Sequence, residues 1–151
     1  EIKGMEAVRR DWTDLAHDFQ VRLLELAFAR RSLAEIQEHV AVVLRELRAG
    51  SLDAKLVYRK ALRKAVSEYT RNTPPHVKAA ALLEAGRRRG LIRYVVTLAG
   101  PQPVGRLTAA PDYEHYVDKQ LKPIASAFTQ ALGTDLGELF GSGGERQLQL
   151  F

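Results

Sequence analysis

The chain has 151 residues, of which 46% are hydrophobic and 27% are charged, and its formal net charge is +5. This composition is that of an ordinary globular domain, and no apolar run is long enough to cross a bilayer, so a disordered chain and a membrane span are both excluded. The chain contains no cysteine, which excludes disulfide frameworks, thiolate nucleophiles and cysteine-based zinc sites.

The first third of the chain predicts a helical hairpin. Thr13 can cap a helix that runs to about Arg30 with apolar residues along one stripe. Ser32 and Glu35 form the S-x-x-E capping box of a second helix. This helix should end just before Gly50, where a left-handed residue can close the last turn. We therefore expect two helices joined by a short turn.

The middle of the chain favours strands. Residues 56–58 and 92–97 are rich in β-branched and aromatic side chains, and Gly90 and Gly100 bound the second segment. The two segments are expected to form a small antiparallel pair. The proline and glycine residues of segment 101–105 predict a loop directly after the second strand.

Two more helices are expected on either side of the second strand. Residues 73–75 (TPP) resemble a helix start with proline at the first helical position, and that helix would end near Arg88. Asp112 can cap a last long helix that runs to Leu132, and Pro123 is expected to kink it. The predicted fold class is therefore mostly α with a small antiparallel β element.

Positive charge is concentrated between Lys55 and Arg93. This stretch holds eleven basic and two acidic side chains, a net charge of +9, so the remaining residues together carry −4. The same stretch contains hydroxyl and amide side chains that can donate hydrogen bonds. Such a concentration of positive charge beside such donors is typical of a surface that binds the nucleic-acid backbone without reading bases. Two other interpretations stay open: a solvated basic face, and a free-standing helical adaptor that binds an acidic protein.

Catalytic patterns are scarce in the sequence. His17 and Asp18 form a pair that occurs in metal-dependent phosphohydrolases, but no further ligands follow at metal-binding spacing, so a surface pair is the favoured interpretation. The sequence has no G-x-S-x-G motif, no glycine-rich loop followed by lysine and no paired-carboxylate signature. We therefore expect neither a catalytic site nor a metal site in this chain.

The C-terminal segment predicts a tethered peptide. Residues 141–144 (GSGG) have too little side chain to pack and are expected to form a flexible spacer. Residues 147–151 (QLQLF) follow it with three large apolar side chains. Apolar groups in such a place suit a peptide that binds in a partner's pocket.

Seven segments follow one another in order along nearly the whole chain. They are KGMEAVRRDW (3–12), LVYRK (56–60), SEYTRNTPPHVKAA (67–80), IRYV (92–95), GPQP (100–103), DYEHY (112–116) and QLKP (120–123). Together they resemble family B DNA polymerases: the first resembles the palm-to-thumb junction, and the others resemble the thumb of bacterial members of the polymerase II type.

The resemblance implies a division of the chain into a palm-to-thumb junction (1–12), a thumb domain (13–140) and a flexible linker with a clamp-binding tail (141–151). The chain begins with Glu1 rather than Met, and we expect it to be a piece of a longer polymerase. In this family the palm carboxylates act with Mg²⁺ and belong to motifs absent from this sequence. The resemblance therefore implies a DNA-directed DNA polymerase, a nucleotidyltransferase, for the parent protein and no enzyme activity for this piece alone.

The resemblance also implies two sets of binding residues. In the family the thumb closes over the minor-groove side of the primer–template duplex. For Tyr69 and Val77 in this chain, core packing is the favoured interpretation over contact with DNA. The implied duplex contacts are Arg63, Lys64, Arg71, Asn72, Thr73, His76 and Lys78. The tail is similar to the peptide that docks bacterial polymerases into the sliding clamp, and its implied contacts are Gln147, Leu148, Leu150 and Phe151.

The expected partners are thus duplex DNA, the bacterial sliding clamp, and the palm and exonuclease domains of the parent chain. No cofactor is expected in this piece itself. The expected location is the cytoplasm, in association with the nucleoid and with no membrane contact.

Overall fold

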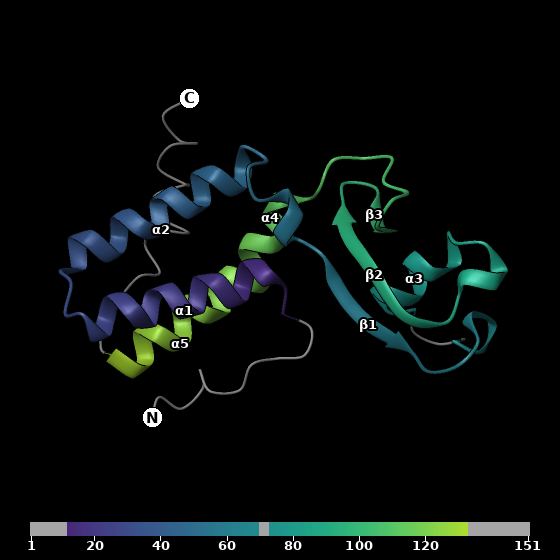
Figure 1. Ribbon diagram of the computed structural model, residues 1–151, viewed down its shortest axis with the longest axis horizontal. Coiled ribbons are helices and arrows are strands. Elements are labelled where there is room, and N and C mark those ends of the chain that lie inside the picture. The colour runs from purple at the N-terminus through teal and green to yellow at the C-terminus, as the bar shows by residue number, and fades with distance from the viewer. Residues whose placement is uncertain (1–11, 70–72, 133–151) are drawn as a thin grey trace.

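Within the described residues, 12–69 and 73–132, the chain forms a lobe of long helices and a lobe made of a small sheet and a short helix (Figure 1). The helices of the first lobe in this computed structural model are α1 (Asp14–Phe28), α2 (Leu33–Arg48) and α5 (Lys122–Leu132). No helix in this part of the chain is long and apolar enough to cross a membrane. The predicted spacer and tail (141–151) lie outside the described residues.

The helices α1 and α2 form the predicted hairpin, and both begin at the predicted caps. The hydroxyl oxygen of Thr13 accepts a hydrogen bond from the amide of Ala16 at 3.3 Å. In α2 the Ser32 hydroxyl accepts from the amide of Glu35, and the Glu35 carboxylate accepts from the amide of Ser32, each at 3.2 Å. Local sequence therefore determines both helix starts.

Both helices also end in a similar way, with one residue in the left-handed conformation. After α1 this residue is Arg30 (φ +57°), and the amide of Arg31 donates to the carbonyl of Leu26 at 3.0 Å. After α2 it is Gly50 (φ +86°), as the sequence predicts. The predicted end of α1 near Arg30 was two residues late, because the left-handed residue closes the helix rather than extending it.

The sheet contains three antiparallel strands in the order β1-β2-β3. The strands are β1 (Tyr58–Leu62), β2 (Gly90–Thr97) and β3 (Gly100–Pro103). The predicted antiparallel pair is confirmed by β1 and β2, in which Tyr58 lies opposite Tyr94. However, β1 begins later than the predicted segment 56–58, because Leu56 is buried in the core and its carbonyl accepts a hydrogen bond from a tyrosine hydroxyl.

The strand β3 occupies part of the segment predicted to be a loop, and that prediction was wrong. Its prolines are tolerated because β3 lies at the edge of the sheet. The amide of Val104 donates to the carbonyl of Arg93 at 3.0 Å, so the backbone N–H and C=O groups of the even-numbered residues in this segment point toward β2. Pro101 and Pro103 alternate with them, and the amides that they lack would point away from the sheet.

The short helix α3 (Pro75–Ala81) contacts all three strands and begins with proline at the first helical position, as predicted. It ends well before the predicted end near Arg88. The guanidinium of Arg88 turns back and donates to the carbonyls of Ala81 (2.9 Å) and Leu83 (2.7 Å). This basic side chain thus satisfies carbonyls that the end of the helix leaves without a partner.

The last helical segment begins with α4 (Tyr113–Tyr116) and continues through a π-helical turn (Val117–Leu121) into α5. As predicted, Asp112 caps it, with its carboxylate accepting from the amide of His115 at 3.2 Å. The break expected at Pro123 takes the form of the π-helical turn just before it. Proline has no amide to donate to the preceding turn, so a widened turn there costs little.

One hydrophobic core connects the two lobes. Tyr116 is fully buried at the junction, and its hydroxyl donates to the carbonyl of Leu56 (2.7 Å) and accepts from the amide of Val96 (3.0 Å). Tyr116 is therefore a packing residue of the core. Tyr113 is only partly buried, and its hydroxyl donates to Asp53 at 3.0 Å.

Candidate functional site

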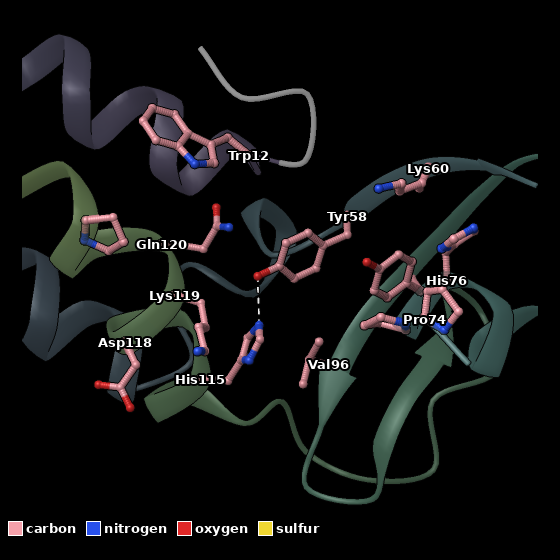
Figure 2. A pocket seen from close by; sticks show the side chains of 13 residues that line it. Trp12, Tyr58, Lys60, Pro74, His76, Val96, His115, Asp118, Lys119 and Gln120 are labelled. Carbon is pink, nitrogen blue, oxygen red and sulfur yellow. Dashed lines mark hydrogen bonds between the residues drawn. The ribbon is translucent and has the colours of Figure 1, made fainter. Parts of the chain in front are cut away.

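A groove of about 460 Å³ lies where the two lobes meet (Figure 2). The sheet lobe lines it with Tyr58, Lys60, Pro74, His76 and Tyr94, among others. The helical lobe lines it with Trp12, His115, Asp118, Lys119 and Gln120, among others. A cavity of this size between two structural units is a common place for a binding site.

The floor of the groove is a packed aromatic layer. Tyr58 and Tyr94 face each other across β1 and β2, with ring centroids 5.2 Å apart and planes 15° apart. Tyr116 stacks near Tyr58 as well, with centroids 5.5 Å apart. Each of these rings is at most 6% exposed, so the layer shapes the groove and gives little surface to a ligand.

The helical wall of the groove depends on the π-helical turn. Gln120 lies in this turn and is buried, and its side-chain oxygen accepts from both the amide (3.0 Å) and the hydroxyl (2.9 Å) of Thr13. Lys119 and Asp118, in the same turn, are exposed and line the groove. π-helical turns often occur at functional sites, where they change the direction of side chains.

Two histidines lie in the groove, one on each wall. Burial and the nearby charge of Lys60 both lower the pKa of His76. Its Nδ1 atom is buried and has no hydrogen-bond partner among the residues that the structure describes. Burial also lowers the pKa of His115, whose Nε2 atom is hydrogen-bonded to the Tyr58 hydroxyl at 2.7 Å. Both imidazoles are thus neutral near pH 7 and able to take up a proton beside an anion.

The residues with predicted duplex contacts lie mainly beside the groove, on the sheet lobe. Arg63 and Lys64 are exposed after the end of β1, Thr73 is exposed before α3, and Lys78 is exposed on α3. His76 is 95% buried and lines the groove rather than the outer surface. The other two predicted contacts, Arg71 and Asn72, lie outside the described residues, as do the four tail residues predicted to bind a clamp, Gln147, Leu148, Leu150 and Phe151.

Among the described bases of the basic stretch, Lys55, Arg59 and Arg88 bond carboxylates or backbone carbonyls. Lys55 pairs with Asp18 at 2.7 Å, and Arg59 lies 3.8 Å from Asp14. Arg88 closes α3 through backbone carbonyls, as described above. These contacts tie the basic stretch to the helical lobe and to α3, and they leave these three cations less available to a ligand.

Other cations of the stretch have no ion pair with any residue in the described part of the chain. These are Lys60, Arg63, Lys64, Lys78, Arg87, Arg89 and Arg93. Sequence reasoning did not select Lys60 or Lys119 as contacts, although both line the groove. The alternation of β1 could have indicated Lys60, because it puts Lys60 on the same face as Tyr58.

The metal interpretation of His17 and Asp18 finds no support. Asp18 is occupied by Lys55, and the described residues contain no group of three or more His, Cys, Asp or Glu that could hold a metal ion. Val77 is 1% exposed, which confirms its packing role. Tyr69 is only half-buried and lies outside the core cluster, so its predicted role in the core was wrong.

A protein-family model described as DNA polymerase family B matches residues 1–131. The chain belongs to this family. Among its relatives, DNA polymerase II of Escherichia coli is 47% identical over 82% of this chain and 17% of its own length. DNA polymerase 2 of Aeropyrum pernix is 35% identical over 98% of this chain and 20% of its own length. The chain thus spans about a fifth of the length of these relatives.

The fold is similar to a solved family B structure as well. The DNA polymerase of the archaeon Pyrobaculum calidifontis matches 83% of this chain and 18% of its own, with a TM-score of 0.63 and 27% sequence identity. Sequence and structure therefore agree on the family that the sequence segments resemble.

Proposed function

We propose that this chain is the thumb domain of a DNA-directed DNA polymerase and that it grips primer–template duplex through phosphate contacts. The observation that carries this proposal is a set of cations, on both walls of the groove and on the sheet lobe, that have no ion pair with any described residue. Lys60 and Lys119 line its two walls, and Arg63, Lys64 and Lys78 are exposed on the sheet lobe beside it. Family membership supplies DNA as the polyanion that such a surface would bind.

The chemistry of this surface favours contact without base readout. Its members are lysines and arginines on exposed positions, which attract phosphate from any sequence. The neutral histidines of the groove add two groups that can become charged beside a phosphate. We therefore expect similar affinity for duplexes of different sequence.

The polymerase activity itself belongs, in this proposal, to the parent protein. Its Mg²⁺ would be held by palm carboxylates outside this chain, and the described residues offer no group that could hold the metal in their place. Palm and exonuclease domains would be the intramolecular partners of the thumb. The parent would act in the cytoplasm, in association with the nucleoid.

A comparison of groove lysines with a distant arginine tests the DNA-binding proposal. Lys60→Ala and Lys119→Ala should each weaken duplex binding, and each should lower the slope of log affinity against log salt by roughly 0.9, the contribution of one phosphate contact. Arg45→Ala is the matched control, because Arg45 is exposed on α2 and does not line the groove. Fluorescence anisotropy with a labelled duplex measures both quantities.

Equal losses for Arg45→Ala and the two groove variants would contradict the proposed interface. They would show that total charge, rather than the groove, determines the affinity. An acidic protein that competes better than DNA for the wild-type chain would instead favour the adaptor interpretation. Two duplexes of unrelated sequence should give the same ranking of variants, since the contacts are to phosphates.

We also propose that residues 147–151 dock the polymerase into a bacterial sliding clamp. The support for this is the QLQLF sequence after a GSGG spacer. A tether of this kind would keep the polymerase on the clamp while the thumb follows the duplex. Clamp binding should be lost from a chain that lacks residues 147–151 and retained when Ser142 is changed to Ala. Equal binding by the shortened and intact chains would refute this role.

A further inference from the structure

The connection between β1 and α3 contains one side chain that contacts three of the predicted duplex-binding residues. Tyr69 follows a short 3-10 turn (Val66–Glu68) and is half-buried outside the core. Its hydroxyl oxygen accepts a hydrogen bond from the amide of Arg63 at 3.3 Å. The ammonium of Lys64 lies 4.7 Å from the centroid of its ring. The ring of His76 meets it edge-on, with centroids 6.0 Å apart and planes 87° apart.

These three contacts join parts of the chain that are otherwise separate. Arg63 and Lys64 follow β1, whereas His76 lies in the first turn of α3 on the wall of the groove. Tyr69 therefore connects the exposed basic segment after β1 to the groove. The aromatic face holds the ammonium by a cation–π interaction, and the hydroxyl holds the backbone one residue earlier.

The energetic importance of such an arrangement lies in the freedom of the lysine side chain. A free lysine samples many rotamers and loses that freedom when it meets a phosphate. A lysine already restricted by an aromatic ring loses less, so the same contact gives a higher affinity. Lys64 has no ion pair with any described residue, so the ring is the only restraint found for its ammonium within that part of the chain.

We propose that Tyr69 is a positioning residue for DNA binding, whose ring holds the ammonium of Lys64 in place for contact with phosphates. This inference depends on the proposed function, since it requires that the basic surface binds duplex DNA. It adds a role that neither charge nor burial of Tyr69 would indicate. Tyr69 acts through Lys64 and does not itself need to touch the DNA.

Two substitutions at Tyr69 separate the ring from the hydroxyl. Tyr69→Phe keeps the aromatic face and should bind duplex nearly as well as wild type. Tyr69→Leu removes the face and should weaken binding roughly two- to fivefold, the range expected for one exposed cation–π contact. Tyr113→Leu is the matched control, because Tyr113 is also half-buried and its hydroxyl donates to Asp53, outside the basic stretch.

A double-mutant cycle on the full chain then tests whether Tyr69 acts through Lys64. Duplex affinity is measured by anisotropy for wild type, Tyr69→Leu, Lys64→Ala and the double variant, and the unfolding free energy of each is measured in urea. In the Lys64→Ala background, Tyr69→Leu should cause no further loss of affinity. A merely structural tyrosine would give equal losses in both backgrounds, and that result would overturn the inference.

Failure of this inference can be distinguished from failure of the proposed function. If the wild-type chain binds duplex and Tyr69→Leu binds equally well, the positioning role is wrong and the DNA-binding surface remains. If the wild-type chain does not bind duplex DNA at all, both proposals are overturned. Retention of wild-type affinity by Tyr69→Phe, together with loss by Tyr69→Leu, supports the ring as the active part.

Discussion

Tyr116→Phe is expected to lower the free energy of unfolding by roughly 2–4 kcal/mol, since it leaves a buried carbonyl without a partner at about 1–3 kcal/mol and a part-buried amide without a partner at a smaller cost. The hydroxyl of Tyr116 bonds the carbonyl of Leu56 and the amide of Val96 at once. The side chain is completely buried, so water cannot replace these bonds without rearrangement. The same burial raises the pKa of Tyr116, as expected for a phenol that stays neutral in the core.

The loss should also be visible in how the two lobes hold together. Leu56 precedes β1, Val96 belongs to β2 and Tyr116 ends α4, so one hydroxyl ties the last helical segment to the sheet lobe. Equilibrium urea unfolding measures the free energy, and hydrogen exchange at the amide of Val96 should accelerate.

Tyr113→Phe is the control for Tyr116→Phe. It removes a bond to the exposed Asp53 and should change stability by less than about 1 kcal/mol. If both variants were equally stable, the hydroxyl of Tyr116 would not be a structural link between the lobes.

Local signals explain the parts of the fold that the sequence predicted well. The caps at Thr13 and Ser32 and the left-handed residue at Gly50 depend on hydrogen bonds among residues close in the chain. The antiparallel pair of β1 and β2 follows from side-chain type within each segment. Such features need no knowledge of the remaining chain.

Long-range contacts explain the parts that were wrong. The prolines of β3 predict a loop, because a strand tolerates them only at the edge of a sheet and the local sequence does not show that β3 lies there. Leu56 resembles the start of a strand, but its carbonyl accepts a hydrogen bond from the hydroxyl of Tyr116, sixty residues later. The end of α3 likewise depends on Arg88, whose guanidinium donates to the carbonyl of Ala81. The spacing of apolar residues along a helix does not predict this contact.

The candidate site was predicted in part for the same reason. Charge density indicated the sheet lobe correctly as the basic region, and it contains Arg63, Lys64 and Lys78. Charge density alone could not show that Lys55 is occupied by Asp18. Nor could it indicate Lys119, which reaches the groove from a different lobe and from a π-helical turn.

Acidification is expected to destabilise the protein over the range in which its shifted histidines titrate. Burial is the main cause that lowers the pKa of His39, His76 and His115. Because each folded-state pKa lies below its unfolded value of about 6.5, the unfolded chain binds protons first as the pH falls. The stabilisation from the neutral imidazoles is therefore complete above about pH 6.5 and is lost as the pH falls through the folded pKa values.

Urea unfolding between about pH 7.5 and pH 5 should thus show a steady loss of free energy of unfolding. His115→Asn should make this loss smaller, because the variant has no imidazole to protonate at this position. The hydrogen bond between His115 and Tyr58 is then also no longer a source of pH dependence. His39, which packs against Phe19 in the helical lobe away from the groove, gives a matched variant, His39→Asn. An identical pH dependence in wild type and both variants would exclude His39 and His115 as its cause.

Duplex DNA should oppose this acid effect at the groove but not in the helical lobe. A phosphate near His76 would raise the pKa of that imidazole, so binding would take up a proton and strengthen as the pH falls from about 7.5 to 6. His76→Asn should reduce this dependence of affinity on pH, whereas His39→Asn should leave it unchanged. If wild-type affinity were the same throughout that range, DNA would not approach His76, and the duplex would have to lie on the outer surface around Arg63 and Lys78.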